Sequence, residues 1–247
     1  MAQPLPHALP CRAAAMRLCM LLLTQLGGGG SHAQQQQRSP RPARVEHSRQ
    51  IWHSLERNPG LIPYDMIGAE ELLITRNGSL LSFAEATKCD PGFLGCEDND
   101  GRHDILVKRS DDNGASFGDA RLVHSESTAT ASVVIGNAAA VLDERTGRIQ
   151  LFMCRNNSAV LLSHSDDNGQ SWAAPRDVTK MVKRDDWGWV ATTFSGIQLK
   201  RQPSSSGRNG RLLICADHQD HGDSRCAARL LSAATPLSRF RALSATC

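Results

Sequence analysis

Short apolar runs alternate with polar turns along the chain between residues 72 and 240. The runs are four to eight residues long, and the turns are rich in Gly, Asn, Asp and Ser, which is typical of strands and hairpins. The pattern therefore predicts an all-β protein with three groups of four strands. The first group covers 72–76, 79–86, 104–109 and about 121–124; the second covers 137–143, 148–155, 159–164 and a strand near Trp172; the third covers 193–200, 210–216, 227–232 and a strand near Phe240.

An eight-residue motif follows the third strand of the first group and returns 55 residues later. Residues 110–117 read Ser-Asp-Asp-Asn-Gly-Ala-Ser-Phe, and residues 165–172 read Ser-Asp-Asp-Asn-Gly-Gln-Ser-Trp. The Asp accepts hydrogen bonds from turn amides, and Asn-Gly supplies the positions that need a positive φ. We expect structural hairpin turns with the aromatic side chain folded beneath, formed by Asp112, Gly114 and Phe117 and by Asp167, Gly169 and Trp172. Four strands at this period are typical of a β-propeller blade.

The motif is similar to the Asp box of exo-α-sialidases (neuraminidases), and four further segments resemble that family. They are residues 74–86, 105–110, 195–198 and 210–215. Their order and spacing most resemble the lysosomal-type animal sialidases, from residue 59 to about 240. The resemblance implies a six-bladed β-propeller, of which residues 59–247 would form about three blades. Because a half ring leaves blade faces uncovered, we expect an incomplete product or, as the alternative, a chain completed by another one.

The resemblance implies a retaining hydrolase that removes terminal sialic acid, with a tyrosine nucleophile activated by a glutamate. An aspartate protonates the glycosidic oxygen, and three arginines bind the substrate carboxylate. The family's general acid falls near Asn99, in the acidic segment 97–104, so Asp98 or Asp100 is the candidate. Neighbouring carboxylates raise one another's pKa, which keeps a general acid protonated. A solvated acidic turn explains the same residues equally well.

Two arginine positions of the family depart from its pattern in this chain. Gly68 stands in the slot of the first clamp arginine, and Thr87 stands where the Ala-Glu-Ala-Arg segment usually ends. Lys88 is the candidate substrate-binding cation, although an ammonium group cannot form a bidentate clamp. The resemblance places the nucleophile, its glutamate and the other two arginines in later blades. The only tyrosine of the chain, Tyr64, lies in the first blade.

No cofactor or metal is implied by the sequence. The acidic, His-containing segment 217–223 has no standard metal-ligand spacing and is better explained as a polar loop. Trp187 and Trp189 are candidates for a sugar-binding wall, with burial in a blade as the commoner alternative.

Residues 1–33 combine basic residues, a short apolar run and small residues before Ala33, which indicates a secretory signal peptide. A disordered tail is the alternative. The apolar run at 18–26 is too short to be a membrane span. Residues 34–58 lack periodicity and are predicted to form a flexible linker. We therefore expect a protein of the secretory pathway, either secreted or lysosomal.

The formal net charge of +3, with both signs interspersed, gives no reason to expect nucleic acid as a partner. The expected partners are sialylated glycans on glycoproteins, gangliosides or oligosaccharides. In a secretory compartment, Asn77 and Asn156 begin glycosylation sequons. The local disulfide candidates are Cys89 with Cys96 and Cys215 with Cys226.

Two functions of different class follow from these patterns. The first is an exo-α-sialidase homologue, hydrolytic in its complete form and inactive as this chain alone. The alternative is a non-catalytic Asp-box propeller that binds glycans or acts as a scaffold. A decayed gene product without function is a third possibility.

Overall fold

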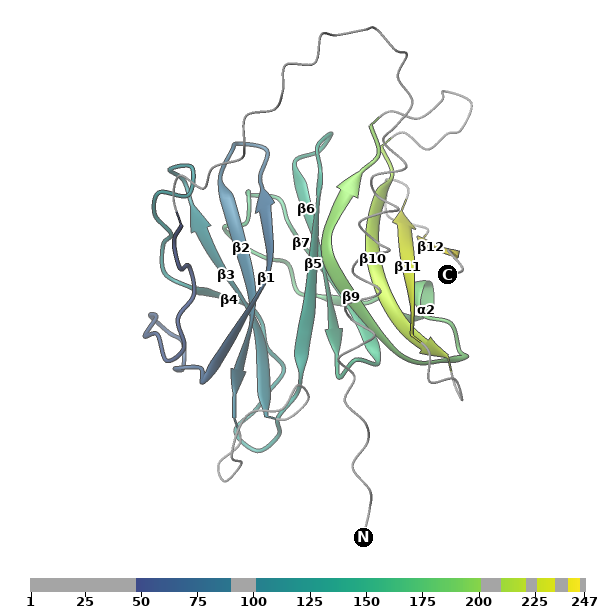
Figure 1. The fold of residues 1–247 in the computed structure, drawn as a ribbon, viewed down its shortest axis with the longest axis horizontal. Helices are drawn as coiled ribbons and strands as arrows, with labels where there is room; N and C mark the ends of the chain where they lie inside the picture. The colour runs from purple at the N-terminus through teal and green to yellow at the C-terminus, as the bar shows by residue number, and fades with distance from the viewer. Residues whose placement is uncertain (1–47, 90–100, 201–209, 221–225, 234–239, 245–247) are drawn as a thin grey trace, which may run out of the picture.

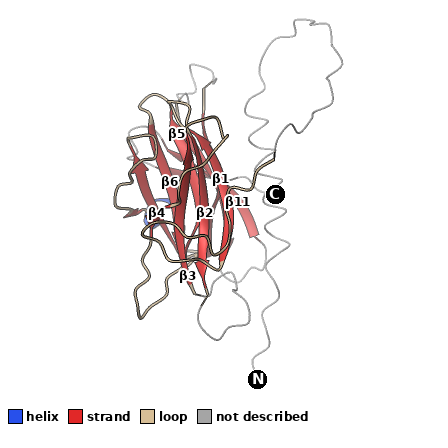
Figure 2. Cartoon of the chain, turned by 90° about the vertical axis from the view of Figure 1, so that its left-hand side faces the viewer, coloured by secondary structure: helices blue, strands red, loops and turns tan. Residues whose placement is uncertain are grey.

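Three antiparallel sheets stand side by side in a computed structural model of the protein (Figure 1). The structure describes residues 48–89, 101–200, 210–220, 226–233 and 240–244. Each sheet has four strands in sequence order, so each is one propeller blade. Seen from the side of blade one, the strands run roughly together and the connecting loops gather at the two ends of the sheets (Figure 2). The all-β prediction with three blades is confirmed.

The strand bounds follow the expected runs closely. Blade one contains β1 (Met66–Ile74), β2 (Leu80–Lys88), β3 (Arg102–Ser110) and β4 (Arg121–His124). Blade two contains β5 (Ile135–Asp143), β6 (Arg148–Arg155), β7 (Ala159–Ser165) and β8 (Arg176–Asp177), and the short helix α2 (Thr179–Val182) follows it. Blade three contains β9 (Trp187–Gln198), β10 (Leu212–Asp220), β11 (Cys226–Ala233) and β12 (Phe240–Ser244).

Three strands differ most from the sequence prediction. β1 begins at Met66, six residues earlier than expected. β9 begins at Trp187, six residues earlier than expected, because Trp187 and Val190 point into the core between blades two and three. β8 lies at Arg176–Asp177 rather than at Trp172, because Trp172 packs on Phe83 of blade one with ring centroids 5.5 Å apart.

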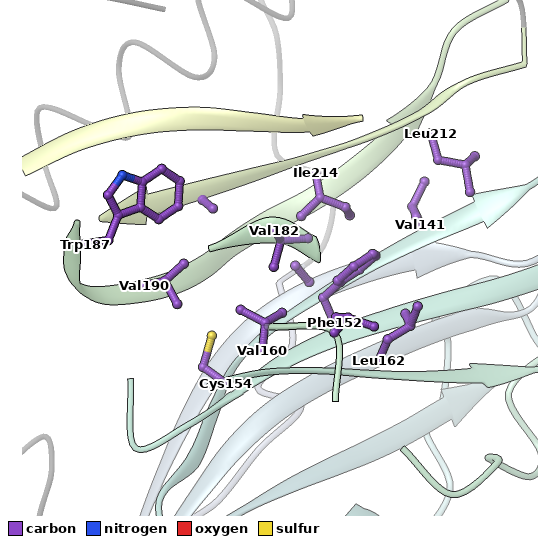
Figure 3. Close-up of a cluster of buried hydrophobic side chains, with 13 residues drawn as sticks. Val141, Phe152, Cys154, Val160, Leu162, Val182, Trp187, Val190, Leu212 and Ile214 are labelled. Atoms are coloured by element: carbon purple, nitrogen blue, oxygen red, sulfur yellow. The ribbon is translucent and has the colours of Figure 1, made fainter. Parts of the chain in front are cut away.

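Apolar side chains at alternating strand positions fill the spaces between neighbouring blades, as the two-residue side-chain period of a strand requires. The core between blades one and two contains Leu81, Phe83, Ile105, Leu151 and Met153 among others. The core between blades two and three, drawn in Figure 3, brings Val141 and Phe152 of blade two against Val190 and Ile214 of blade three. The blades are therefore held together chiefly by burial of apolar surface.

The first strands of the blades, β1, β5 and β9, lie next to one another on the inner side of the arc. Their starting ends therefore come together at one end of the molecule. The turns that follow β3 and β7 lie at the opposite end, because strands alternate in direction within each sheet.

Residues 48–65 cover the face of blade one that points away from blade two. Trp52 and Tyr64 pack there on Ala84, Ala86 and Leu106. The indole N–H of Trp52 donates to Ser82 at 2.8 Å, and the Lys108 ammonium lies 5.0 Å from the Trp52 ring. The packed region thus begins earlier than the predicted linker boundary at residue 58, because a large aromatic side chain is buried here.

Two cysteines of the described residues, Cys89 and Cys215, are disulfide-bonded. The side chain of Cys226, the candidate partner of Cys215, lies outside the described part of the structure, so this pairing stays a prediction. Cys96, the candidate partner of Cys89, lies outside the described residues.

Candidate functional site

A polar cluster lies at the starting ends of the inner strands. The Glu85 carboxylate on β2 is 2.5 Å from Nδ1 of His103 on β3, and its second oxygen accepts from the backbone N–H of Asn137 at 3.1 Å. Gly136 lies directly against this carboxylate, and a Cβ at position 136 would come within 2.1 Å of Glu85 Oε2. Glycine at 136 is therefore what lets β5 of blade two approach Glu85 of blade one.

The cluster continues from Asn137 into blade three. Asn137 has a φ of 57°, which orients its side chain to donate to Asn157 Oδ1 at 2.7 Å. The carbonyl of Asn137 accepts from the buried hydroxyl of Thr192 on β9 at 2.5 Å. The backbone N–H of Val190 donates to the Asn157 carbonyl at 2.9 Å. One hydrogen-bond network thus joins all three blades at this end.

The cluster combines a carboxylate, an imidazole and two amides. The Glu85 side chain is 20% exposed, whereas that of His103 is 3% exposed, so the carboxylate is the group nearer to solvent. Convergent polar groups of this kind can orient a ligand that carries hydroxyl groups. Trp189, one candidate for a sugar-binding wall, is half-buried and lies on the face of β9 opposite to Val190 and Thr192, where its indole N–H donates to Gln219 at 2.9 Å. Trp187, the other candidate for a sugar-binding wall, is instead buried and stacks on His218 with centroids 3.9 Å apart.

The two departures from the sialidase pattern lie beside this cluster. Gly68 pairs with Glu85 across the β1–β2 ladder, so the slot of the first arginine faces the carboxylate without a side chain. Thr87 is buried, with its hydroxyl 3.4 Å from Nδ1 of His103. Glu85 is therefore bound by the His103 imidazole and the Asn137 backbone amide. Its cross-strand neighbour is Gly68, where the resemblance would place an arginine.

The predicted substrate cation, Lys88, lies at the end of β2. Its ammonium forms an ion pair with Asp65 at 2.9 Å, and its side chain is 40% exposed. The hydrogen bond from Lys88 lowers the pKa of Asp65. A substrate carboxylate would have to compete with Asp65 for this ammonium. The general-acid candidates Asp98 and Asp100 lie outside the described residues, so their role stays a prediction.

Tyr64 is unsuited to act as a nucleophile. It is 3% exposed, and its hydroxyl donates to Asp104 Oδ2 at 2.6 Å, while Asp104 also accepts from Arg102 at 2.6 Å. Burial raises the pKa of Tyr64 well above its usual value, and the hydrogen bond to Asp104 raises it further. The phenol therefore stays protonated and enclosed on the outer face of blade one.

The two repeated turns have the same internal hydrogen bonds. Asp112 Oδ1 accepts from the Ser116 amide at 2.8 Å and Oδ2 accepts from the Ser116 hydroxyl at 2.5 Å; Asp167 accepts from Ser171 at 2.9 and 2.5 Å in the same way. The Asn and Gly of each turn have positive φ, between 57° and 84°. The conformation is the one expected of Asn-Gly.

These hydrogen bonds favour the ionised form of both aspartates and so lower their pKa. Hydrogen bonds from Ser116 and Ser110 lower the pKa of Asp112 to about 2. Burial opposes ionisation of Asp167, but hydrogen bonds from Ser171 and Ser165 outweigh it and lower its pKa to about 2. Both turns follow the end of their strand, whereas the Glu85–His103 pair lies at the start of β3. The nine residues of β3 separate the two regions by about 30 Å.

No sequence pattern indicates that His103, Asn137 and Thr192 belong to one site. Glu85 belongs to a segment that carries the family resemblance, but its partner His103 falls in a segment that was assigned to an acidic loop and is part of β3. Asn137 stands at the start of a predicted strand after a glycine, which is the one local signal of a special backbone position. The contact between these residues depends on blade packing.

The described residues contain no group of three or more His, Cys, Asp or Glu side chains placed to hold a metal ion. Within the same part of the chain, no helix has the length and apolarity needed to cross a membrane.

The three blades have the fold of sialidase β-propellers. No protein-family model matches the sequence. A Hadza microbial sialidase superposes with a TM-score of 0.59 at 22% identity, over 71% of this chain and 37% of that one. The leech intramolecular trans-sialidase, in complex with 2,7-anhydro-Neu5Ac, gives 0.63 at 11% identity, over 82% and 46%.

The intramolecular trans-sialidase of Ruminococcus gnavus, in complex with oseltamivir carboxylate, gives a TM-score of 0.61 at 10% identity, over 74% of this chain and 61% of that one. The chain thus spans less than two thirds of each of these three proteins. At these identities the similarity is one of fold.

Proposed function

We propose that this chain is part of an exo-α-sialidase homologue that binds terminal sialic acids and hydrolyses them only in a complete propeller. The observation that supports this most directly is the fold of sialidase propellers, together with a polar cluster that joins Glu85, Asn137 and Thr192 across the three blades. The substrates would be glycoproteins, glycolipids or oligosaccharides.

The proposal includes inactivity of this chain alone, since covalent catalysis needs an activated nucleophile beneath the anomeric carbon. The single tyrosine, Tyr64, is enclosed and protonated on the outer face of blade one. Loss of one positioned donor to a developing charge typically costs about 10²–10³ in rate. A general acid at Asp98 or Asp100 would contribute about 10²–10⁴, too little to replace both nucleophile and clamp.

The test is a fluorogenic sialoside assay on the purified chain. We expect no turnover above buffer. A variant with Asp98→Ala and Asp100→Ala tests the general-acid candidates, and a variant with Asp185→Ala and Asp186→Ala controls for removing two surface carboxylates. Turnover that the first variant abolishes and the second retains would contradict the proposed inactivity and place a working site in these three blades.

A second candidate function is a non-catalytic propeller that binds glycans. The observation that favours it is the state of Glu85, whose carboxylate is bound by His103 and the Asn137 amide opposite Gly68. This arrangement supplies hydrogen-bond acceptors for hydroxyl groups in the place of a guanidinium that would bind a carboxylate.

Calorimetric titration with sialyllactose and with lactose separates the two functions. Binding of both sugars with similar affinity would favour the non-catalytic function, whereas a preference for sialyllactose would favour the sialidase homologue. In either case we expect Glu85→Gln to weaken binding by about tenfold, the size of one hydrogen bond to a charged group. Glu144→Gln, a half-exposed carboxylate at the opposite end of β5, is the matched control and should bind as the wild type does.

A further inference from the structure

Glu71 is a buried carboxyl at the meeting point of the three inner strands. It lies on β1 and is 6% exposed. Its Oε2 accepts a hydrogen bond from the backbone N–H of Ala140 on β5 of blade two. The hydroxyl of Ser195, on β9 of blade three, donates to the Leu72 carbonyl of β1 at 3.4 Å, and its proximity favours ionisation of the Glu71 carboxyl. Within the described residues, Oε1 of Glu71 has no hydrogen-bond partner.

The elements around Glu71 bring no positive charge to it. β9 contains no charged residue, and the only one on β5, Asp143, is bound by Gln198 and Arg145 at the far end of the strand. On β2 the register partner of Glu71 is Phe83, and the titratable side chain two residues further along the same face is Glu85. Glu85 is itself engaged by His103 and Asn137, and Lys88 is paired with Asp65. The side chain of Glu70, beside Glu71 on β1, is outside the described part of the structure.

We propose that Glu71 is a proton-dependent latch between the blades: its neutral carboxyl holds β1, β5 and β9 together, and ionisation loosens their contact. A neutral carboxyl can leave one oxygen without a partner at modest cost, whereas an ionised one in this position would be an uncompensated buried charge. Ionisation would also add repulsion with the Glu85 carboxylate on the same face. The latch is independent of the proposed function, because it concerns blade association and not the binding of a sugar.

The direction of the pH dependence follows from the pKa. Burial raises the pKa of Glu71 from its usual 4.5 to about 8. The Ala140 amide and the nearby Ser195 hydroxyl lower this pKa, but by less than burial raises it. Between these two values the folded chain keeps a proton that the unfolded chain has lost. The stability that the neutral Glu71 carboxyl contributes is therefore fully present below about pH 4.5. It decreases as pH rises toward 8, and over this interval the unfolding constant increases about tenfold per pH unit. The latch favours the folded chain in acidic medium.

Denaturant unfolding of the full chain at several values between pH 5 and pH 9 tests the latch. Glu71→Gln keeps the shape of the neutral carboxyl and cannot ionise. We expect the two proteins to be similar in stability near pH 5, and the unfolding constant of the wild type to exceed that of Glu71→Gln by about 100-fold or more at pH 7.5. Glu144→Gln, a half-exposed side chain at the end of β5, should keep the wild-type profile. A Glu71→Gln profile parallel to the wild type would overturn the proposal.

A second measurement avoids dependence on a variant of Glu71 that fails to fold. Infrared difference spectra of the wild type should show the C=O stretch of a protonated carboxylic acid at pH 6.5 and lose it above about pH 8. In Ser195→Ala the loss should occur at higher pH, because the hydroxyl that favours ionisation of Glu71 has been removed. Absence of the protonated band at pH 6.5, or a band that Ser195→Ala does not shift, would contradict the latch.

Discussion

At the residue scale, the lack of a side chain at Gly68 changes the surroundings of Glu85. Gly68 leaves the row opposite Glu85 without a cation, and the carboxylate is bound instead by His103 at 2.5 Å and by the Asn137 amide. Glu85 is therefore bound by neighbours on β3 and β5, and β1 contributes no side chain to it at this row.

The repeated turns give a prediction at the same scale. Asp112→Ala and Asp167→Ala each remove an acceptor from a serine amide and a serine hydroxyl. We expect both variants to melt at a lower temperature than the wild type, and Asp167→Ala to lose more because its turn also supports the contact with blade one. Asp119→Ala, an exposed aspartate just beyond the first turn, should melt as the wild type does. Unchanged melting together with lost glycan binding would show that these aspartates are functional rather than structural.

The pKa values of Asp112 and Asp167 predict that their contribution to stability is lost at low pH. Because the pKa of each is lowered to about 2 in the folded chain, from a usual value of 3.8, the stability they supply is present above about pH 4. It is lost as pH falls from 4 toward 2. The difference in melting temperature between the wild type and Asp167→Ala should therefore shrink over this interval.

At the element scale, the second repeated turn is a contact between blades as well as a hairpin. Arg109 and Arg121 of blade one donate to the carbonyls of three consecutive turn residues, at 2.6 to 3.0 Å. The ring of Trp172 meets Phe83 edge to face, and Gly169 lies against Leu81. The described residues contain no blade before blade one, so the two turns differ in surroundings although six of their eight residues are identical.

Gly169→Ala should therefore destabilise the protein more than an alanine at another glycine of positive φ. A Cβ at 169 would come 2.4 Å from Leu81 Cδ1, whereas one at Gly78 would meet nothing within 4 Å. Both substitutions place alanine at a positive φ, 80° and 92°, which costs about 1–2 kcal/mol. Overpacking at 169 adds about 1–3 kcal/mol. Equal losses for Gly169→Ala and Gly78→Ala in denaturant unfolding would rule out the inter-blade contact as a source of stability.

At the scale of the whole molecule, the arc of three blades is joined by two apolar cores and by the network from Glu85 to Thr192. Residues 48–65 lie on the outer face of blade one, where Trp52 and Tyr64 are buried. This segment replaces solvent on a face that would otherwise expose Ala84, Ala86 and Leu106. Coverage of that face opposes the aggregation expected of a bare sheet.

Export is a prediction about the chain as a whole. We propose that a secretory host releases a protein that begins near Gln34 and carries a glycan at Asn77 or Asn156. Both asparagines lie in exposed turns, Asn77 between β1 and β2 and Asn156 between β6 and β7. Mass spectrometry before and after enzymatic deglycosylation measures both features, with Asn77→Gln and Asn156→Gln as site controls. Exported protein with an intact Met1 would contradict the cleavage.

The sequence by itself determined the elements that depend on local pattern. Short apolar runs between polar turns located most strands, and Asn-Gly located both repeated turns, because strand burial and positive φ are properties of a few adjacent residues. The 55-residue spacing of the turns indicated blades, since a repeat in sequence becomes a repeat in structure.

Only the tertiary structure decided which polar residues meet. Glu85 and Asn137 are 52 residues apart, Asn137 and Thr192 are 55 apart, and Glu71 reaches Ala140 across 69 residues. No local pattern encodes these distances, because they depend on how one blade packs on the next through shared apolar cores. The same packing buried Glu71 among three strands, although in the sequence it is one of two adjacent glutamates before an apolar run. The pKa of Glu71 is set by that environment, which exists only when the blades are assembled.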